Sequence, residues 1–285
     1  MIISGRQIGE DATCFIVAEA GLAHNGIFEN ALKLIDMAAE AECDAVKFQV
    51  YRTEELISKE RAPEWFDRFQ KKELPYENFS MLKEYAEKQG LIWFATPHTQ
   101  SAFEYLKSIN VPCYKIGSGE HDIKFIDKIA DTGKPLIIST GMRTHYEVLS
   151  LIDRYGGRKS AFLHCVTSYP AIDPLLNLGF IPSMKRHAAA SRSVIGYSDH
   201  TDGTLACEIA VSMGAKIIEK HICLEDTEGQ DVKVSIKDRK GLIVLVKRIR
   251  QIEGMIGSRF RNYSAEEKEN EKWALKSQLD GRRPI

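Results

Sequence analysis

Two histidines stand near the ends of short apolar runs, where they could act as metal ligands. His200 lies near the end of SVIGYSDHT, and His221 near the end of AKIIEKHI. Two imidazoles with open coordination positions can hold a divalent cation that also binds a substrate oxygen. His24 and His164 also lie at the ends of predicted strands and could compete as ligands. The alternative is two unrelated histidines, one capping a strand and one packed inside the fold.

Lysines and hydroxyls form a second group at the ends of such runs. Lys47 and Lys115 each lie near the end of a run, and the hydroxyl residues there are Thr96, Ser118, Ser139, Thr140 and Ser198. Together with the loop glycines Gly117, Gly119 and Gly141, the set is typical of a cradle for phosphate and carboxylate groups. Taken singly, each hydroxyl is explained as well by hydrogen bonding at a strand end. Glu19 is a candidate acid or base, or merely the partner of a lysine.

Eight apolar runs must position these side chains. They are Cys14–Gly21, Asp44–Gln49, Leu91–Pro97, Pro112–Gly119, Pro135–Gly141, Ser160–Pro170, Ser193–Thr201 and Ala215–Ile222. Continuous apolar runs are typical of parallel strands covered on both faces. Amphipathic patterns between the runs predict helices at Asn30–Glu42, Asn78–Gln89, Ser101–Ile109, Ile123–Thr132, Thr144–Tyr155, Leu178–His187, Thr204–Met213 and Lys237–Ile256.

The alternation of strand and helix, with polar residues at the strand ends, predicts a (β/α)8 TIM barrel. A doubly wound sheet is the alternative, but it would concentrate ligands at one switch point. Alternate strand residues share a side, so Lys47 and Gln49 should point the same way. The same spacing places Glu219 with His221 and turns Lys220 to the opposite side.

Bulk properties predict a cytoplasmic protein that binds neither nucleic acid nor membrane. The net charge of -1 argues against a general nucleic-acid surface. No apolar stretch approaches the ~20 residues that span a bilayer, and the first residues lack the pattern of a signal peptide. Six cysteines without a CxxC pair indicate small buried hydrophobes in a reducing compartment. Cys165 beside His164 is a weaker candidate nucleophile.

Two segments depart from the regular alternation. Residues 51–76 are charged and aromatic, and a loop of this length is often a lid or binding loop. Residues 258–285 are charged, with a helical pattern at 265–276. We therefore expect a catalytic barrel over residues 1–257 and a C-terminal arm or linker over 258–285.

The chain resembles the sialic acid synthases, the NeuB-like group that also includes legionaminate, pseudaminate and SpsE-type spore-coat polysaccharide synthases. The matching words are AEAGLAHNG, DAVKFQ, FATP, YKIGSGE, GKPLIISTGM, LHCVTSYP, IGYSDHT and IIEKHI. They occur in the family's order and cover roughly residues 12 to 257.

The resemblance implies a transferase of the N-acetylneuraminate synthase type. Such a TIM barrel condenses phosphoenolpyruvate with a hexosamine-type aldose, giving a 2-keto-3-deoxy sugar acid and phosphate. It uses a divalent metal, usually Mn²⁺, with Mg²⁺ or Co²⁺ as alternatives. By position, the metal ligands fall on His200 and His221, and the catalytic groups on Glu19, Lys47 and Lys115. The phosphoenolpyruvate contacts fall on Lys47, Thr96, Lys115, Ser118, Ser139 and Ser198, and the sugar contacts on Gln49, Glu120, Tyr169 and Asp231.

Two departures from the family pattern concern the sugar. The element usually read as PGPD is EGQD here, which keeps Asp231 but loses the prolines. Typical members continue into a C-terminal antifreeze-like (SAF) domain, whose arginine reaches the N-acyl group in the partner subunit. We expect this chain to lack that domain, so that Arg282 or Arg283 makes the contact or the sugar does not require it. A shortened chain is the other explanation. A homodimer would need other surfaces, such as residues 51–76 or the arm.

Two other functions are compatible with the sequence. A 3-deoxy-octulosonate or heptulosonate phosphate synthase would need a further basic site for a sugar phosphate, with Arg52 and Arg143 as loop candidates. A barrel that has lost catalysis could serve as a binding or scaffold subunit. The retained Glu19 and the two histidines argue against that loss.

Overall fold

Parallel strands close into a barrel in the order β10-β3-β4-β5-β6-β7-β8-β9. The structure is a computed structural model that describes residues 1–258 and 260–283. The barrel strands are β3 (Phe15–Gly21), β4 (Ala45–Val50), β5 (Ile92–Pro97), β6 (Tyr114–Ile116), β7 (Leu136–Ser139), β8 (Ser160–Cys165), β9 (Val194–Asp199) and β10 (Ile217–His221). This closed parallel arrangement confirms the predicted TIM barrel.

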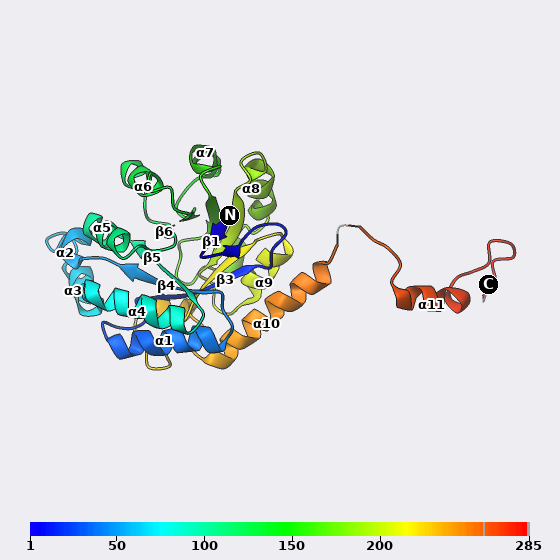
Figure 1. The fold of residues 1–285 in the computed structure, drawn as a ribbon, viewed down its shortest axis with the longest axis horizontal. Coiled ribbons are helices and arrows are strands. Elements are labelled where there is room, and N and C mark those ends of the chain that lie inside the picture. The colour runs from blue at the N-terminus through cyan, green and yellow to red at the C-terminus, as the bar shows by residue number, and fades with distance from the viewer. Residues whose placement is uncertain (259, 284–285) are drawn as a thin grey trace. The chain divides into compact units, whose positions relative to one another are not determined.

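Helices surround the strands (Figure 1). They are α1 (Phe28–Glu40), α4 (Tyr76–Lys88), α5 (Gln100–Ser108), α6 (Ile123–Ala130), α7 (His145–Tyr155), α8 (Phe180–Ala188), α9 (Leu205–Ser212) and α10 (Arg239–Ile256). Each predicted helix is present, with its ends within two residues of the prediction. Local capping fixes several starts, since Thr144 and Glu147 form a capping box at α7. The runs ending at Gly119 and Pro170 were too long as strands, because β6 and β8 stop before the loops that follow.

Two apolar layers hold the barrel together. The larger layer packs the outward faces of the strands against the helices. The smaller one fills the barrel interior with residues such as Phe15, Phe94 and Leu163. Gly196 makes room within it, because a Cβ there would lie 2.5 Å from both the Ile217 carbonyl oxygen and a Leu163 methyl carbon. The interior is therefore a packed core.

An N-terminal hairpin, which the sequence analysis did not predict, packs against the barrel interior. Strands β1 (Ile2–Ile3) and β2 (Arg6–Gln7) pair antiparallel. Ser4 and Gly5 between them both have positive φ, as a tight hairpin turn requires. Ile3 and Ile8 join the interior apolar cluster together with residues from the start of the barrel strands. The Ser-Gly turn directly after the apolar pair Ile2–Ile3 was the available signal.

The segment 51–76 is more ordered than the predicted loop. It contains α2 (Thr53–Leu56) and α3 (Pro63–Lys72), with Pro63 at the helix start, a position that favours proline. The sequence analysis described this segment only as a long loop of the kind that is often a lid or binding loop, and it did not predict these two helices. Charged residues on the outer face of α3 obscured a short helix that buries Phe66.

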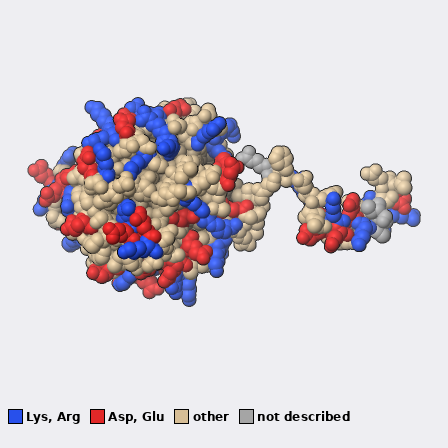
Figure 2. All heavy atoms as spheres, in the orientation of Figure 1, with Lys and Arg blue, Asp and Glu red and all other residues tan. Residues whose placement is uncertain are grey.

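The chain divides into two compact units, Met1–Glu253 and Gly254–Ile285. In the second unit, α11 (Ala265–Ala274) starts at a capping box of Ser264 and Glu267. The predicted arm 258–285 includes positions 259, 284 and 285, which lie outside the described residues. Among the described helices, none has both the length and the apolar character to cross a bilayer. Basic and acidic side chains are interspersed on the barrel face drawn in Figure 2.

Candidate active site

A layer of mostly polar side chains lies directly beyond the apolar interior, at the carboxyl ends of the strands. Lys47 comes two residues after the interior residue Ala45, and Glu219 two after Ile217. Alternate strand residues point the same way, so this spacing brings the side chains together at the barrel mouth. The same spacing places Glu19, Thr96, Lys115, Ser139 and Cys165 in the layer.

Two carboxylates and two ammonium groups pair at the mouth, and we call them the Lys–Glu cluster (Glu19, Lys47, Lys115 and Glu219). Lys47 Nζ lies 3.0 Å from Glu19 Oε1 and 3.8 Å from Glu219 Oε2. Lys115 Nζ lies 3.8 Å from Glu219 Oε1. All four side chains are buried. Unpaired charges are costly away from water, so the equal number of opposite charges is what makes the cluster stable there.

Hydroxyl groups complete this cluster. Lys47 donates to Thr96 Oγ1 at 3.1 Å, and Lys115 donates to Ser139 Oγ at 2.6 Å. Ser198 donates to Glu219 Oε1 at 3.0 Å. The two ammonium groups are thus held in place beside hydroxyls that can donate to an incoming anion. Such an arrangement suits a phosphate or carboxylate, which accepts several hydrogen bonds at once.

The two carboxyl groups of the cluster differ in acidity. Burial raises the pKa of Glu19 against the opposing effect of Lys47. Burial acts on Glu219 in the same direction, but Lys115 and Lys47 outweigh it and lower the pKa of Glu219. Glu19 Oε1 accepts from Gln49 Nε2 at 2.9 Å, whereas the buried Glu19 Oε2 has no hydrogen-bond partner among the described residues. A raised pKa and an uncommitted oxygen suit Glu19 to proton transfer.

The two lysines of the cluster also differ in pKa. Burial lowers the pKa of Lys115, and the charge of Glu219 only partly offsets this effect. For Lys47, the two carboxylates Glu19 and Glu219 outweigh burial and raise the pKa. Lys47 is therefore the more firmly charged of the two.

His200 and His221 lie at the ends of adjacent strands, with ring centroids 5.3 Å apart. His200 Nδ1 is 2.8 Å from the Val166 carbonyl oxygen, and this contact fixes Nδ1 as the protonated nitrogen. His200 Nε2 can then accept from the Tyr169 hydroxyl at 2.9 Å. Burial, reinforced by His200, lowers the pKa of His221 well below its ordinary value. His221 is therefore a neutral imidazole at neutral pH.

These histidines fit a divalent cation that completes its coordination with substrate and water. The carbonyl contact leaves His200 Nε2 as the metal-binding nitrogen, a common arrangement for ligating histidines. Within the described part of the chain, no hydrogen bond occupies the His221 ring nitrogens. No group of three or more His, Cys, Asp or Glu side chains among the described residues forms a closed metal site. Two protein ligands leave several positions open, as catalysis requires.

Most of the predicted site residues line one cavity of about 150 Å³ at the mouth. They are Glu19, Lys47, Gln49, Thr96, Lys115, Ser118, Ser139, Tyr169, Ser198, His200 and His221. The structure thus brings the predicted metal, phosphoenolpyruvate and acid/base residues together. Glu120 and Asp231 are not among its lining residues.

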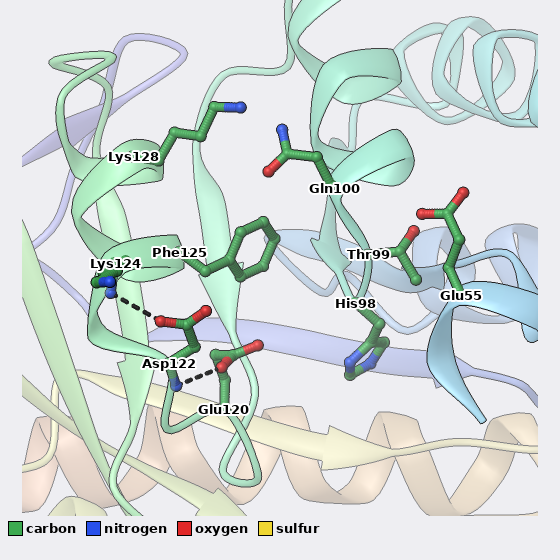
Figure 3. Close-up of a pocket in the computed structure, with 9 residues that line it drawn as sticks. All are labelled: Glu55, His98, Thr99, Gln100, Glu120, Asp122, Lys124, Phe125 and Lys128. Atoms are coloured by element: carbon green, nitrogen blue, oxygen red, sulfur yellow. Dashed lines mark hydrogen bonds between the residues drawn. The ribbon is translucent and has the colours of Figure 1, made fainter. Parts of the chain in front are cut away.

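Glu120 lies on the rim, in a neighbouring hollow between α5 and α6. Figure 3 shows its carboxylate accepting from the Asp122 backbone N–H, at 2.7 Å. Asp122 in turn caps α6 by accepting from Lys124 N at 2.9 Å. His98 lines both this hollow and the mouth cavity, so the two spaces adjoin.

Asp231 lies in a short 3₁₀ helix, Gln230–Val234, after β10. Burial raises the pKa of its carboxyl, and the nearby Lys72 partly offsets that shift. Lys72, at the end of α3, also donates to the Glu228 carbonyl oxygen at 3.0 Å. The EGQD loop is therefore held by the segment 51–76 rather than by prolines.

Two residues at the mouth, Glu219 and His98, had no role assigned from the sequence, and a third, Cys165, was only a weak candidate nucleophile. Strand parity placed Glu219 at the mouth but did not show that it pairs with both lysines. His98 directly follows β5 and lines the cavity, and desolvation lowers its pKa to about 3. Cys165 Sγ lies 3.7 Å from His200 Nδ1. Their positions in or directly after predicted strands could have identified them as residues of the barrel mouth.

Three weaker candidates do not belong to the mouth cavity. His164 faces the helical layer, where its Nε2 lies 2.7 Å from the Leu176 carbonyl oxygen. His24 Nδ1 accepts from Gly26 N at 3.0 Å, and burial lowers the pKa of His24 to about 3. Thr140 donates to the Leu163 carbonyl oxygen at 3.1 Å, which is ordinary hydrogen bonding at a strand end. All six cysteines are buried and free.

The chain is similar in sequence to known proteins over most of its length. Residues 34–261 match a family model described as the NeuB family. An uncharacterized protein, MJ1065 of Methanocaldococcus jannaschii, is 40% identical over 90% of this chain and 76% of its own. The N,N'-diacetyllegionaminic acid synthase of Legionella pneumophila is 35% identical over 88% of this chain and 75% of its own.

A solved structure is similar as well. It is the N-acetylneuraminic acid (sialic acid) synthetase of Leptospira borgpetersenii, with a TM-score of 0.87 and 33% identity. The similarity covers 95% of this chain and 94% of the other.

Proposed function

The chain belongs to the NeuB family, and we propose that it is a transferase that condenses phosphoenolpyruvate with an N-acylhexosamine-type aldose. The products are a sialic-acid-like 2-keto-3-deoxy sugar acid and phosphate, as in N-acetylneuraminate synthesis. The observation that supports the proposal most is the Lys–Glu cluster beside two histidines in one cavity.

Phosphoenolpyruvate would bind through the ammonium and hydroxyl groups of the mouth. Lys47 and Lys115 neutralise its phosphate and carboxylate, and Thr96, Ser118, Ser139 and Ser198 supply further hydrogen bonds. Lys115 donates to Ser139 Oγ at 2.6 Å, so the Ser139 hydroxyl proton remains free to donate to an anion bound beside both groups. Preorganised donors of this kind stabilise the charge that develops during a reaction.

C3 of phosphoenolpyruvate attacks the aldehyde carbon of the aldose, so that the new carbon–carbon bond forms while the C=O bond opens to an alkoxide, which takes up a proton. Positive charge develops at C2, water adds there, and Glu19 accepts one proton of that water. The remaining hydroxyl proton at C2 is lost as the keto group forms and the C2–O bond to phosphate breaks. The uncommitted Oε2 of Glu19 and its raised pKa suit this step. Gln49 orients Glu19, and we place the sugar near Gln49, Glu120, Tyr169 and Asp231.

His200 and His221 would hold the divalent cation, for which Mn²⁺ is our first choice and Mg²⁺ or Co²⁺ the alternatives. When bound, the cation polarises the aldehyde oxygen of the aldose.

An octulosonate or heptulosonate phosphate synthase fits the mouth less well. Both loop arginines that could bind a sugar phosphate are committed to contacts within the protein. Arg52 pairs with Glu73 at 2.9 Å and stacks on Tyr76. Arg143 donates to the Glu120 carbonyl oxygen at 2.7 Å.

The proposal is tested by following phosphate release from phosphoenolpyruvate in the presence of Mn²⁺ and an aldose. The panel is N-acetylmannosamine, its 6-phosphate and a di-N-acetylated 6-deoxyaldohexose, with mass spectrometry of the products. We expect aldose-dependent phosphate release that Glu19→Gln suppresses. The absence of phosphate release with every aldose of the panel, from correctly folded and metal-loaded protein, would refute the proposal.

A further inference from the structure

A second cavity, with an apolar wall, adjoins the candidate active site. Its volume is about 640 Å³, larger than that of the mouth cavity. Trp65, Phe69, Leu56 and Ile57, all from the segment 51–76, form the wall. Trp65 is 47% exposed, which is high for a residue of its size and apolar character.

The wall is held in a defined position. The Tyr51 hydroxyl donates to the Phe69 carbonyl oxygen at 2.9 Å, and the Tyr51 and Phe69 rings meet edge to face. Glu73 accepts from both the backbone N–H and the hydroxyl of Thr53 at 2.7 Å, which ties the two ends of the segment together. Arg68 stacks on Trp65 at 4.8 Å from the ring centroid. A fixed aromatic wall is a preformed binding surface.

The cavity is continuous with the site where the chemistry would occur. Gln49, His98 and Gly119 line both spaces. The amide of Gln49 also donates to Glu19, so one residue connects the apolar wall to the proposed acid/base group. A molecule whose reactive end lies at the mouth can therefore extend its other end along Trp65.

The polar groups of the cavity do not suit a phosphate. Arg61 is the one cationic residue among those lining it in the described chain, and the carboxylate of Glu120 lies on the same lining. Desolvation lowers the pKa of His98 to about 3, so His98 is neutral at neutral pH. A phosphate monoester carries a charge of about -1.5 to -2 and favours several cationic or N–H donors.

We propose that the cavity walled by Trp65 and Phe69 is the subsite for the end of the aldose remote from its aldehyde. It accepts a neutral, methyl-bearing end, such as an acetamido group or a deoxy carbon, rather than a phosphate. Methyl groups and the C–H faces of a sugar pack on aromatic rings, while Gln49 and Glu120 can bind the hydroxyl and amide groups. This inference rests on the proposed function and adds the class of sugar to it.

The test compares steady-state kinetics of the wild type and Trp65→Ala with the same three aldoses at saturating phosphoenolpyruvate and Mn²⁺. We expect the wild type to favour the di-N-acetylated 6-deoxyaldohexose over N-acetylmannosamine 6-phosphate. Trp65→Ala should raise the KM for the neutral sugar about tenfold, the effect expected from losing one aromatic contact. The KM for phosphoenolpyruvate should not change, and Trp65→Phe should restore most of the loss.

Met81→Ala is the matched control, because Met81 on α4 has almost the same exposure, 48%, and does not line the cavity. If the wild type is active but Trp65→Ala leaves every aldose KM unchanged, the subsite is refuted while the proposed function stands. Preference of the wild type for the 6-phosphate would also refute it. If Trp65→Ala changes the oligomeric state on gel filtration without changing any KM, the apolar wall is an interface with a second copy of the chain, and the subsite is refuted. A wild type inactive with every aldose refutes the proposed function and this inference with it.

Discussion

Lys220 Nζ lies 2.6 Å from Asp199 Oδ2, and both side chains are almost completely buried on the outward side of the barrel wall. Each residue is the immediate chain neighbour of one histidine at the mouth. Asp199 also accepts from the Tyr197 hydroxyl and from Thr201 N, at 2.9 and 3.0 Å. This ion pair therefore joins β9 to β10 directly behind His200 and His221.

Breaking this buried ion pair should make the positions of His200 and His221 less well fixed. Lys220→Met leaves Asp199 without its counter-ion, which we expect to lower the free energy of unfolding by about 3–5 kcal/mol. It should also weaken Mn²⁺ binding about tenfold, because groups that orient ligands contribute to metal affinity. Denaturant unfolding and isothermal titration measure the two effects.

Arg158→Met is the control for that variant, since Arg158 and Asp131 form a pair in which both side chains are more than half exposed. It should cost no more than about 1 kcal/mol. Unchanged Mn²⁺ affinity in correctly folded Lys220→Met would show that the pair serves stability alone.

Measurements of Mn²⁺ affinity should distinguish the roles of the two histidines from the role of Tyr169. His200→Ala and His221→Ala should each lower Mn²⁺ affinity more than about 100-fold, since each removes a direct ligand. Tyr169→Phe should not lower it, because the hydroxyl contacts His200 Nε2, the nitrogen assigned to the metal. Its expected effect is a higher KM for the aldose. His187→Ala, a partly exposed histidine paired with Asp153, should change neither value.

The dependence of kcat/KM on pH should be bell-shaped. Glu19 acts as a base only when ionised, so activity should rise with pH through a pKa that burial raises. Activity should fall again through the lowered pKa of Lys115, because a neutral amine binds an anion more weakly. Glu19→Gln should reduce the rate about 10²–10⁴-fold and remove the acidic limb. Lys115→Arg should move the alkaline limb to higher pH. An acidic limb unchanged in Glu19→Gln would assign the base to another group.

Gly141 should be required for anion binding because of the space it leaves. A Cβ there would lie 2.2 Å from Thr167 Oγ1 and 2.7 Å from Ser118 Cβ. Gly141→Ala should displace the Ser118 loop, raise the KM for phosphoenolpyruvate about tenfold and cost about 1–3 kcal/mol of stability. Gly179→Ala is the control, because a Cβ there meets no atom within 4 Å. Equal KM values for the two variants would contradict the steric argument.

Much of the barrel and its mouth could be predicted because the signals are local. Continuous apolar runs identified the barrel strands, and helical periodicity located α1 and the helices from α4 to α10 to within two residues. The two-residue period of a strand placed Lys47 with Gln49 and Glu219 with His221 on a shared side, since a one-residue shift would turn them the other way. By contrast, the weak local pattern of the β1–β2 hairpin and the charged surface of α3 concealed both elements.

The sequence by itself determined which side of each strand carries chemistry, because side-chain alternation along a strand depends on the backbone alone. Only the tertiary structure decided which of these side chains meet. Closure of the barrel brings β10 beside β3 and places Glu219 within 3.8 Å of both lysines, whose strands are far from it in the sequence. Tertiary packing likewise set Trp65 beside Gln49 around one cavity. Contacts between distant segments depend on strand order and loop packing, which no local pattern encodes.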